Sequence, residues 1–129
     1  KVQRYLCEAE QRTAGGKTLT LILALNYSSR SEITRAVQRI AARVAAGELA
    51  PREISEGTVS ASLDTAPYPN PDLVVRTSGE CRLSNFLLWQ ASYAELYFPE
   101  VLWPDFTEEE FDRAIEEYAR RDRRFGLVK

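Results

Sequence analysis

The sequence predicts an α/β protein with a mostly parallel central sheet flanked by helices. Two apolar runs, residues 19–24 (LTLILA) and 73–75 (LVV), have the character of buried strands. Between them lies a segment with apolar residues at helical spacing, so that strand, turn and helix form the first part of a β–α–β unit. At 129 residues and 44% hydrophobic, the chain is expected to form one modest core.

The first half of the chain is predicted to place one helix on each side of the 19–24 run. Residues 2–12 have helical spacing, and a pair of glycines then interrupts the pattern. After the run comes a polar turn. Ser29 and Glu32 form a capping-box pattern at the start of the second helix, which we expect to end near Gly47. The apolar stripe of that helix consists of Ile33, Ala36, Val37, Ile40, Ala41 and Val44.

The second half contains shorter elements. Residues 51–63 predict a short helix, and a group of prolines then forms a stiff connector to the next strand. Residues 95–98 (ELYF) predict a further strand, and residues 103–106 predict a turn. Thr107 with Glu110 is a second capping-box pattern and starts the last helix. One face of that helix is lined by Phe111, Ala114, Ile115 and Tyr118.

Composition excludes several classes of function. A net charge of −2 argues against a nucleic-acid-binding surface. The chain has no histidine, which excludes Ser-His-Asp and Cys-His catalysis and histidine-based metal sites. Its two cysteines do not have the spacing of a metal or disulfide framework. No apolar run is long enough to span a bilayer.

Residues 76–84 (RTSGECRLS), here called the arginine-rich loop, directly follow the 73–75 strand. Arg76 and Arg82 supply guanidinium groups, which bind phosphate oxygens in a bidentate fork, and Ser84 adds a hydroxyl donor. In open α/β sheets, ligands bind beyond the carboxyl ends of the strands. The loop therefore predicts a site for an oxyanion such as phosphate.

The alternative is a solvated loop in which the arginines only pair with Glu80, since such surface pairs are common and contribute little stability. Residues 86–89 (FLLW) favour the site, because a run this apolar anchors the loop directly on the core. Phe86 and Trp89 are accordingly expected to be core residues.

Four segments carry a resemblance to a known family. They are residues 76–80 (RTSGE), 82–90 (RLSNFLLWQ), 94–98 (AELYF) and 102–106 (LWPDF). In this order they closely resemble the cis-prenyltransferases, which include the undecaprenyl and dehydrodolichyl diphosphate synthases. In weaker form the resemblance extends over residues 1–126. It implies the C-terminal part of the cis-prenyltransferase fold.

The resemblance also implies an activity and a set of site residues. The family condenses isopentenyl diphosphate with an allylic diphosphate to give a Z-configured prenyl diphosphate. Three residues would bind the diphosphate of isopentenyl diphosphate: Arg76, Arg82 and Ser84. Glu95 would help to hold Mg²⁺, a hard cation that binds carboxylate and phosphate oxygens. Arg124 and Gly126 match a tail motif, Arg-x-Gly, that reaches the partner's active site in homodimeric members.

The resemblance supports a substrate-binding role for Asn26 only weakly. The family has an equivalent Asn-Tyr turn near its active site, usually with two glycines and an aspartate. Here those positions hold Ser28, Ser29 and Glu32. A helix N-terminus beside Asn26 is also suited to an anion without any resemblance, although a plain capped crossover helix explains the same pattern.

One departure from the family is large. Its Asp-Gly-Asn-x-Arg loop, which carries the catalytic aspartate, does not occur in the 129 residues, and neither does methionine. We therefore expect residues 1–129 to be the C-terminal half of a single domain, with no catalytic residue of its own. A different class remains as the alternative, a non-catalytic structural or activating subunit of a heteromeric prenyltransferase. A stand-alone phosphate-binding module is a third, weaker one.

The expected partners follow from the resemblance. They are isopentenyl diphosphate, an allylic diphosphate, and a second copy of the protein in a homodimer, or a related subunit in a heteromer. The lipid product suggests peripheral membrane association, and no nucleic acid is expected. The expected location is the cytoplasm, with the plastid and the cytosolic face of the endoplasmic reticulum as alternatives.

Overall fold

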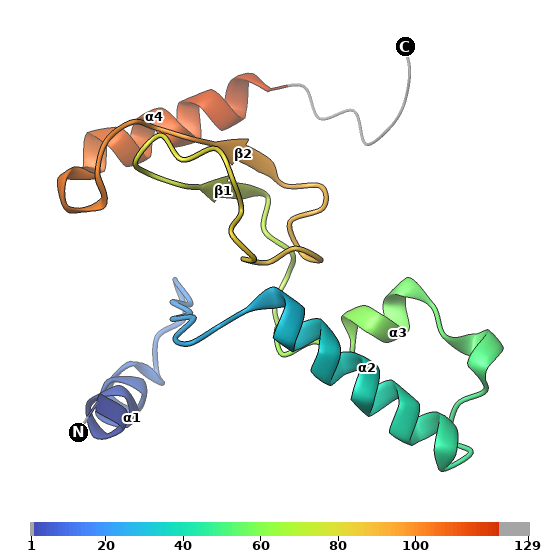
Figure 1. Ribbon diagram of the computed structural model, residues 1–129. Coiled ribbons are helices and arrows are strands. Elements are labelled where there is room, and N and C mark those ends of the chain that lie inside the picture. Colours follow the sequence, from blue (N-terminus) through green and yellow to red (C-terminus); the bar gives the residue numbers. More distant parts are fainter. Residues whose placement is uncertain (1, 122–129) are drawn as a thin grey trace.

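A computed structural model describes residues 2–121. The elements follow the chain as α1 (Val2–Thr13), α2 (Ser29–Ala45), the 3₁₀ turn η1 (Pro51–Glu53), α3 (Glu56–Ser60), β1 (Leu73–Val75), β2 (Glu95–Tyr97), the 3₁₀ turn η2 (Trp103–Asp105) and α4 (Glu108–Arg120). Figure 1 shows three parts: an arm formed by α1 and the coil after it, the pair α2 and α3, and the two strands with α4. The predicted α/β class is confirmed.

The sheet consists of β1 and β2, which are parallel. Leu73 pairs with Glu95, and Val75 pairs with Tyr97. Helix α4 lies along the sheet (Figure 1), and the residue that follows it fixes its end there. The Arg121 Nη1 donates to the Leu96 carbonyl and to Glu95 Oε2, at 2.9 Å each. Both predicted strands of the second half are therefore present, although their side chains are only half-buried.

Helix α2 is confirmed, but its predicted capping box is wrong. Ser28 is the residue before the helix and makes no capping hydrogen bond, while Ser29 and Glu32 are fully buried. The cap comes from a distant segment: the Arg30 amide donates to Asn85 Oδ1 at 2.9 Å, and the Ser29 amide donates to the Asn85 carbonyl at 2.9 Å. A local cap is not needed, because the residue that satisfies the first amides arrives from the loop after β1.

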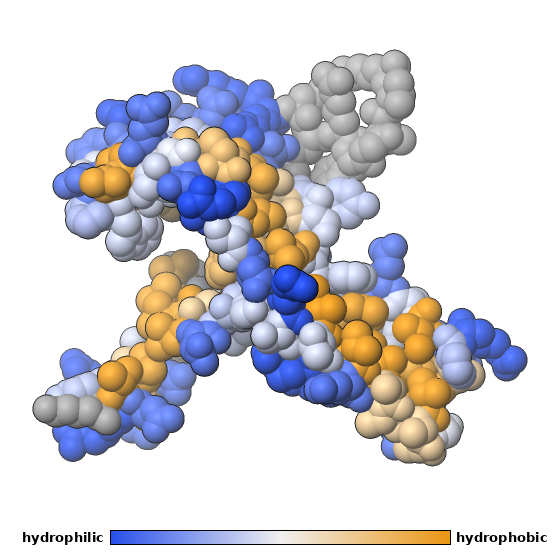
Figure 2. Space-filling view, viewed as in Figure 1, coloured by the Kyte–Doolittle hydropathy of each residue, from blue (hydrophilic) through white to orange (hydrophobic). Residues whose placement is uncertain are grey.

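The predicted strand at residues 19–24 is also wrong. This run is coil, and its side chains are exposed, with Leu19 at 84% and Leu21 at 76%. Figure 2 shows the apolar surface along this arm, which stands away from the sheet. A strand exists only with a neighbour that accepts and donates its ladder hydrogen bonds. Within residues 2–121, β1 and β2 pair with each other alone, so the run has no such neighbour.

Several smaller expectations are corrected as well. The 51–63 helix is divided into η1 and α3, because Ser55 interrupts it and caps α3 by accepting from the Thr58 amide. Thr107 precedes α4 without a side-chain capping hydrogen bond, and Glu110 pairs with Arg113 instead. Phe86 is 41% exposed and is not a core residue.

The predicted helix at residues 2–12 is confirmed as α1, and the turn at 103–106 takes the form of η2. Within residues 2–121 the buried apolar side chains are few: Ala36, Ile40, Leu63, Ala91 and Ala114. None of the helices in residues 2–121 is both long and apolar enough to cross a membrane.

Candidate functional site

The arginine-rich loop leaves the carboxyl end of β1 and is held there by backbone hydrogen bonds. The Arg76 amide continues the ladder by donating to the Tyr97 carbonyl at 2.9 Å. The Ser78 amide donates to the Val101 carbonyl at 2.8 Å, and the Gly79 amide donates to the Pro99 carbonyl at 2.9 Å. The start of the loop is therefore fixed against the segment that follows β2.

The backbone of this region adopts the left-handed conformation repeatedly. Ser78 has φ 72°, Ser84 has φ 46°, Asn85 has φ 64° and Leu87 has φ 48°. Non-glycine residues adopt this conformation at a cost, and they keep it only where the surrounding contacts enforce it. Gly79, with φ 63°, adopts it without that cost. Such clusters occur at ligand sites, which makes the loop the leading candidate in the described chain.

The two arginines of the loop differ. Arg76 is half-buried, and within residues 2–121 its guanidinium makes no hydrogen bond or ion pair. Arg82 is 61% exposed and pairs with Glu80. The solvated-pair alternative thus describes Arg82 in this state but not Arg76. A half-buried cation without an anion beside it is electrostatically incomplete, and a bound phosphate oxygen would complete it.

The end of the loop is joined to α2 through Asn85. Its Nδ2 donates to Ser28 Oγ at 2.8 Å, in addition to the contacts that cap the helix. The Phe86 ring meets Tyr27 edge-on, with the ring centroids 5.6 Å apart. These contacts join the two residues that follow Ser84 to the two residues that follow Asn26. Ser84 and Asn26 are both exposed, and Asn26 has φ 53°. The structure therefore joins the end of the arginine-rich loop to the segment that follows Asn26, but within residues 2–121 no hydrogen bond or ion pair joins Arg76 or Arg82 to that segment.

A buried polar network lies behind this junction. Glu32 is fully buried; its Oε2 accepts from Tyr27 Oη at 2.5 Å and from Gln90 Nε2 at 2.9 Å, and its Oε1 accepts from the Thr65 amide at 3.3 Å. Burial, followed by the Glu32 carboxylate beside it, raises the pKa of Tyr27. The sequence patterns predicted a capping role for Glu32 and did not indicate this network. The available signal was that Glu32 lies one helical turn before Ala36, on the face that is buried.

Glu95 lies elsewhere. It opens β2 opposite Leu73, whereas the arginine-rich loop begins after Val75, so along the strand the separation is roughly 10 Å at about 3.3 Å per residue. Its Oε2 is occupied by Arg121. Residues 2–121 contain no group of three or more acidic, cysteine or histidine side chains able to hold a metal ion. Among the described residues, Glu95 is therefore a single candidate metal ligand and not part of a cluster of ligands. Arg124 and Gly126 lie outside the described residues.

Comparison with known proteins identifies the family. The family model described as "Putative undecaprenyl diphosphate synthase" matches residues 1–126. The isoprenyl transferase of Rhizobium meliloti (strain 1021) is 55% identical over 121 residues, which cover 94% of this chain and 49% of that protein. The isoprenyl transferase of Geobacillus kaustophilus (strain HTA426) is 54% identical over 126 residues, or 98% of this chain and 49% of that protein.

Two solved structures share the fold. The lavandulyl diphosphate synthase of Lavandula x intermedia, in complex with dimethylallyl diphosphate, is 40% identical with a TM-score of 0.91, over 97% of this chain and 54% of that one. A probable undecaprenyl diphosphate synthase from Campylobacter jejuni is 40% identical with a TM-score of 0.79, over 98% of this chain and 56% of that one. The chain spans about half the length of the curated relatives it matches. It belongs to the undecaprenyl diphosphate synthase family of prenyltransferases.

Proposed function

We propose that this chain is the isopentenyl-diphosphate-binding, C-terminal half of a polyprenyl diphosphate synthase. The complete protein would join isopentenyl diphosphate to an allylic diphosphate and give a Z-prenyl diphosphate. Family membership supports the reaction class. The Lavandula neighbour was solved with dimethylallyl diphosphate, which is an allylic diphosphate, and this supports the second substrate.

One observation carries the proposal: Arg76 is half-buried, directly follows the carboxyl end of a parallel strand, and has no anion at its guanidinium within residues 2–121. Arg82 and Ser84 follow within eight positions in the same loop. Two guanidinium groups and a hydroxyl match a diphosphate, which has several negatively charged oxygens and needs donors from more than one direction.

In this proposal the described residues bind and orient one substrate. Arg76 and Arg82 hold the diphosphate oxygens of isopentenyl diphosphate, and Arg82 exchanges Glu80 for them. Ser84 donates one further hydrogen bond. With its diphosphate fixed, the double bond of isopentenyl diphosphate is held beside the allylic carbon, where a C–C bond forms as the C–O bond to the leaving diphosphate breaks and a proton is lost. Orientation of this kind lowers the entropic part of the barrier.

We also propose Mg²⁺ as the cofactor, with Glu95 as one of its ligands. Mg²⁺ is commonly bound by one or two carboxylates together with substrate phosphates, so a single carboxylate in this chain is compatible with it. When bound, the ion neutralises charge on a departing diphosphate. The family resemblance supports Glu95 and, through Arg124 and Gly126, a homodimer.

The test compares Arg82→Ala with Arg113→Ala in the complete protein. The two arginines are matched, because each is exposed, at 61% and 63%, and each pairs with a nearby glutamate. Charge-assisted hydrogen bonds contribute about 1.5–3 kcal/mol, so Arg82→Ala should raise the KM for isopentenyl diphosphate by about ten-fold or more. Arg113→Ala should leave it unchanged. Lysine at position 82 should restore part of the affinity, since it supplies charge without the fork.

Steady-state kinetics give both values. Equal KM values in the two alanine variants would contradict the assignment of Arg82. A complete protein that is folded but turns over no substrate, with its arginine-rich loop intact, would instead support the non-catalytic subunit.

A further inference from the structure

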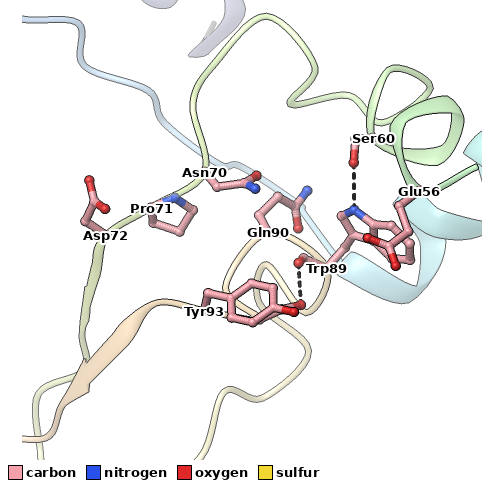
Figure 3. A pocket seen from close by; sticks show the side chains of 9 residues that line it. Glu56, Ser60, Asn70, Pro71, Asp72, Trp89, Gln90 and Tyr93 are labelled. Carbon is pink, nitrogen blue, oxygen red and sulfur yellow. Dashed lines mark hydrogen bonds between the residues drawn. The ribbon is translucent and has the colours of Figure 1, made fainter. Parts of the chain in front are cut away.

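A pocket of about 480 Å³ lies at the other end of the sheet, where the chain enters β1 and β2. Its wall includes Glu56, Asn70, Asp72, Trp89, Gln90 and Tyr93 (Figure 3). No residue of the arginine-rich loop lines it. Its volume lies within the range of small-molecule sites, about 300–1,000 Å³. The sequence patterns did not indicate this pocket, because its residues come from three separate segments.

The pocket contains a buried acceptor without a donor. Gln90 is 4% exposed, and its Nε2 donates to Glu32 Oε2 at 2.9 Å and to Thr65 Oγ1 at 2.7 Å. Because the Glu32 carboxylate accepts hydrogen bonds, these contacts determine which end of the amide is the nitrogen. The Gln90 Oε1 then has no hydrogen-bond partner among the described residues. Figure 3 shows this oxygen turned into the space between Asn70, Trp89 and Tyr93. A buried acceptor of this kind calls for a donor.

The negative charge of the pocket lining favours a positively charged donor. Glu56 and Asp72 contribute two carboxylates, and the lining contains no lysine or arginine. Two aromatic side chains complete the wall, and the Trp89 ring is fixed because its Nε1 donates to Ser60 Oγ at 2.9 Å. Aromatic faces beside carboxylates attract cations and disfavour anions. A diphosphate is thus the wrong ligand for this pocket.

We propose that this pocket binds an organic cation that carries N–H donors, a guanidinium or a primary ammonium, with one N–H donated to Gln90 Oε1. Such a group belongs either to a small molecule or to an arginine or lysine side chain of a bound protein segment. The carboxylates supply the attraction, and the Gln90 oxygen supplies the directional contact.

The test titrates the complete protein with ethylguanidinium and follows the ligand by NMR. For so small a probe we expect saturable binding with a Kd on the order of 1 mM. N-ethylurea, which has nearly the same shape and also carries N–H donors but is uncharged, should bind at least about five-fold more weakly. Glu56→Gln should weaken ethylguanidinium binding by about three- to five-fold, as expected for one exposed ion pair. Glu48→Gln is the matched control, an exposed glutamate outside the lining, and should change nothing.

A second arm separates the two sources of the cation. Acetyl-Gly-Arg-Gly-amide presents the same guanidinium on a peptide; tighter binding than ethylguanidinium identifies a protein segment as the ligand, and equal or weaker binding identifies a small molecule. The proposal is overturned if neither probe binds saturably, if N-ethylurea binds as tightly as ethylguanidinium, or if Glu56→Gln and Glu48→Gln behave alike.

Discussion

Residues 19–25 and β1 are both apolar runs, but only β1 is a strand. Val74 in β1 is half-buried and pairs with Leu96, whereas Leu21 is 76% exposed and has no ladder partner within residues 2–121. The difference is not one of composition, because both runs are apolar throughout apart from one threonine. It shows that the strand state depends on a neighbouring strand as much as on the run itself.

The two parts of the candidate site differ in the same way, because each follows one of these two runs. The arginine-rich loop follows the run that has formed its strand, and the backbone at the start of the loop is fixed by hydrogen bonds to the segment after β2. Asn26 follows the run that has not, and it is exposed. We infer that the arginine-rich loop already has its final conformation in this chain. Asn26 should reach its final position only when other strands pair with residues 19–25.

The largest expected effect concerns the isolated chain. With residues 19–25 exposed and few apolar side chains buried, the 129-residue chain should not form a stable monomer and should aggregate or pair with the remaining strands of its sheet. Thermal denaturation followed by circular dichroism should show no cooperative transition for a monomeric species, with sedimentation as the check on size. A sharp transition from a purified monomer would contradict this.

A point substitution tests whether the exposed run becomes a strand in the complete protein. There, Leu21→Asp should reduce the free energy of unfolding by about 2–5 kcal/mol, because a charged side chain would replace a buried leucine. Leu21→Val is the control and should cost about 1 kcal/mol or less, since it keeps an apolar side chain suited to a strand. Urea denaturation measures both. If Leu21→Asp is as mild as the control, residues 19–25 remain exposed in the complete protein too.

A substitution in the buried network around Glu32 tests whether this network holds the arginine-rich loop to α2. In Glu32→Gln, an amide nitrogen would face Gln90 Nε2 or the Thr65 amide, which are both donors. An unmatched buried polar contact costs about 1–3 kcal/mol, and urea denaturation should show a loss of that size. Glu48→Gln makes the same change at an exposed glutamate and should have little effect. Equal stability of the two variants would show that the network does not hold the loop to α2.

The sequence was sufficient for features that are local and failed for those that join distant segments. Helical spacing located α1, α2 and α4, and the run before Arg76 located β1 and its loop. Asn85 caps α2 from 55 positions away, and Gln90 reaches Glu32 across 58. No periodicity in either segment encodes such a pairing. The same reason explains the error at residues 19–24. Their continuous apolar run suits a buried strand, but the run does not show whether a neighbouring strand is present.

The smallest expected effect is a pH dependence on the surface of α2. Hydrogen bonds from Arg35 and then Arg39 lower the pKa of Asp64. A carboxyl with a lowered folded-state pKa contributes stability above its unfolded pKa of about 4, and that contribution is lost as the pH falls through the folded-state pKa. Because the side chains are exposed, the effect should be at most about 1 kcal/mol. Asp64→Asn should flatten the acid limb of the stability curve, and Asp112→Asn should leave it unchanged.

The most direct measurement of the central claim is a crystal structure of the complete protein with isopentenyl diphosphate. We predict that the diphosphate lies beyond the carboxyl end of β1, with its oxygens within hydrogen-bond distance of the Arg76 and Arg82 guanidinium groups and of Ser84 Oγ. Arg82 should then have left Glu80, its partner in the present structure. A diphosphate bound elsewhere, with Arg76 still lacking an anion and Arg82 still paired with Glu80, would contradict the account.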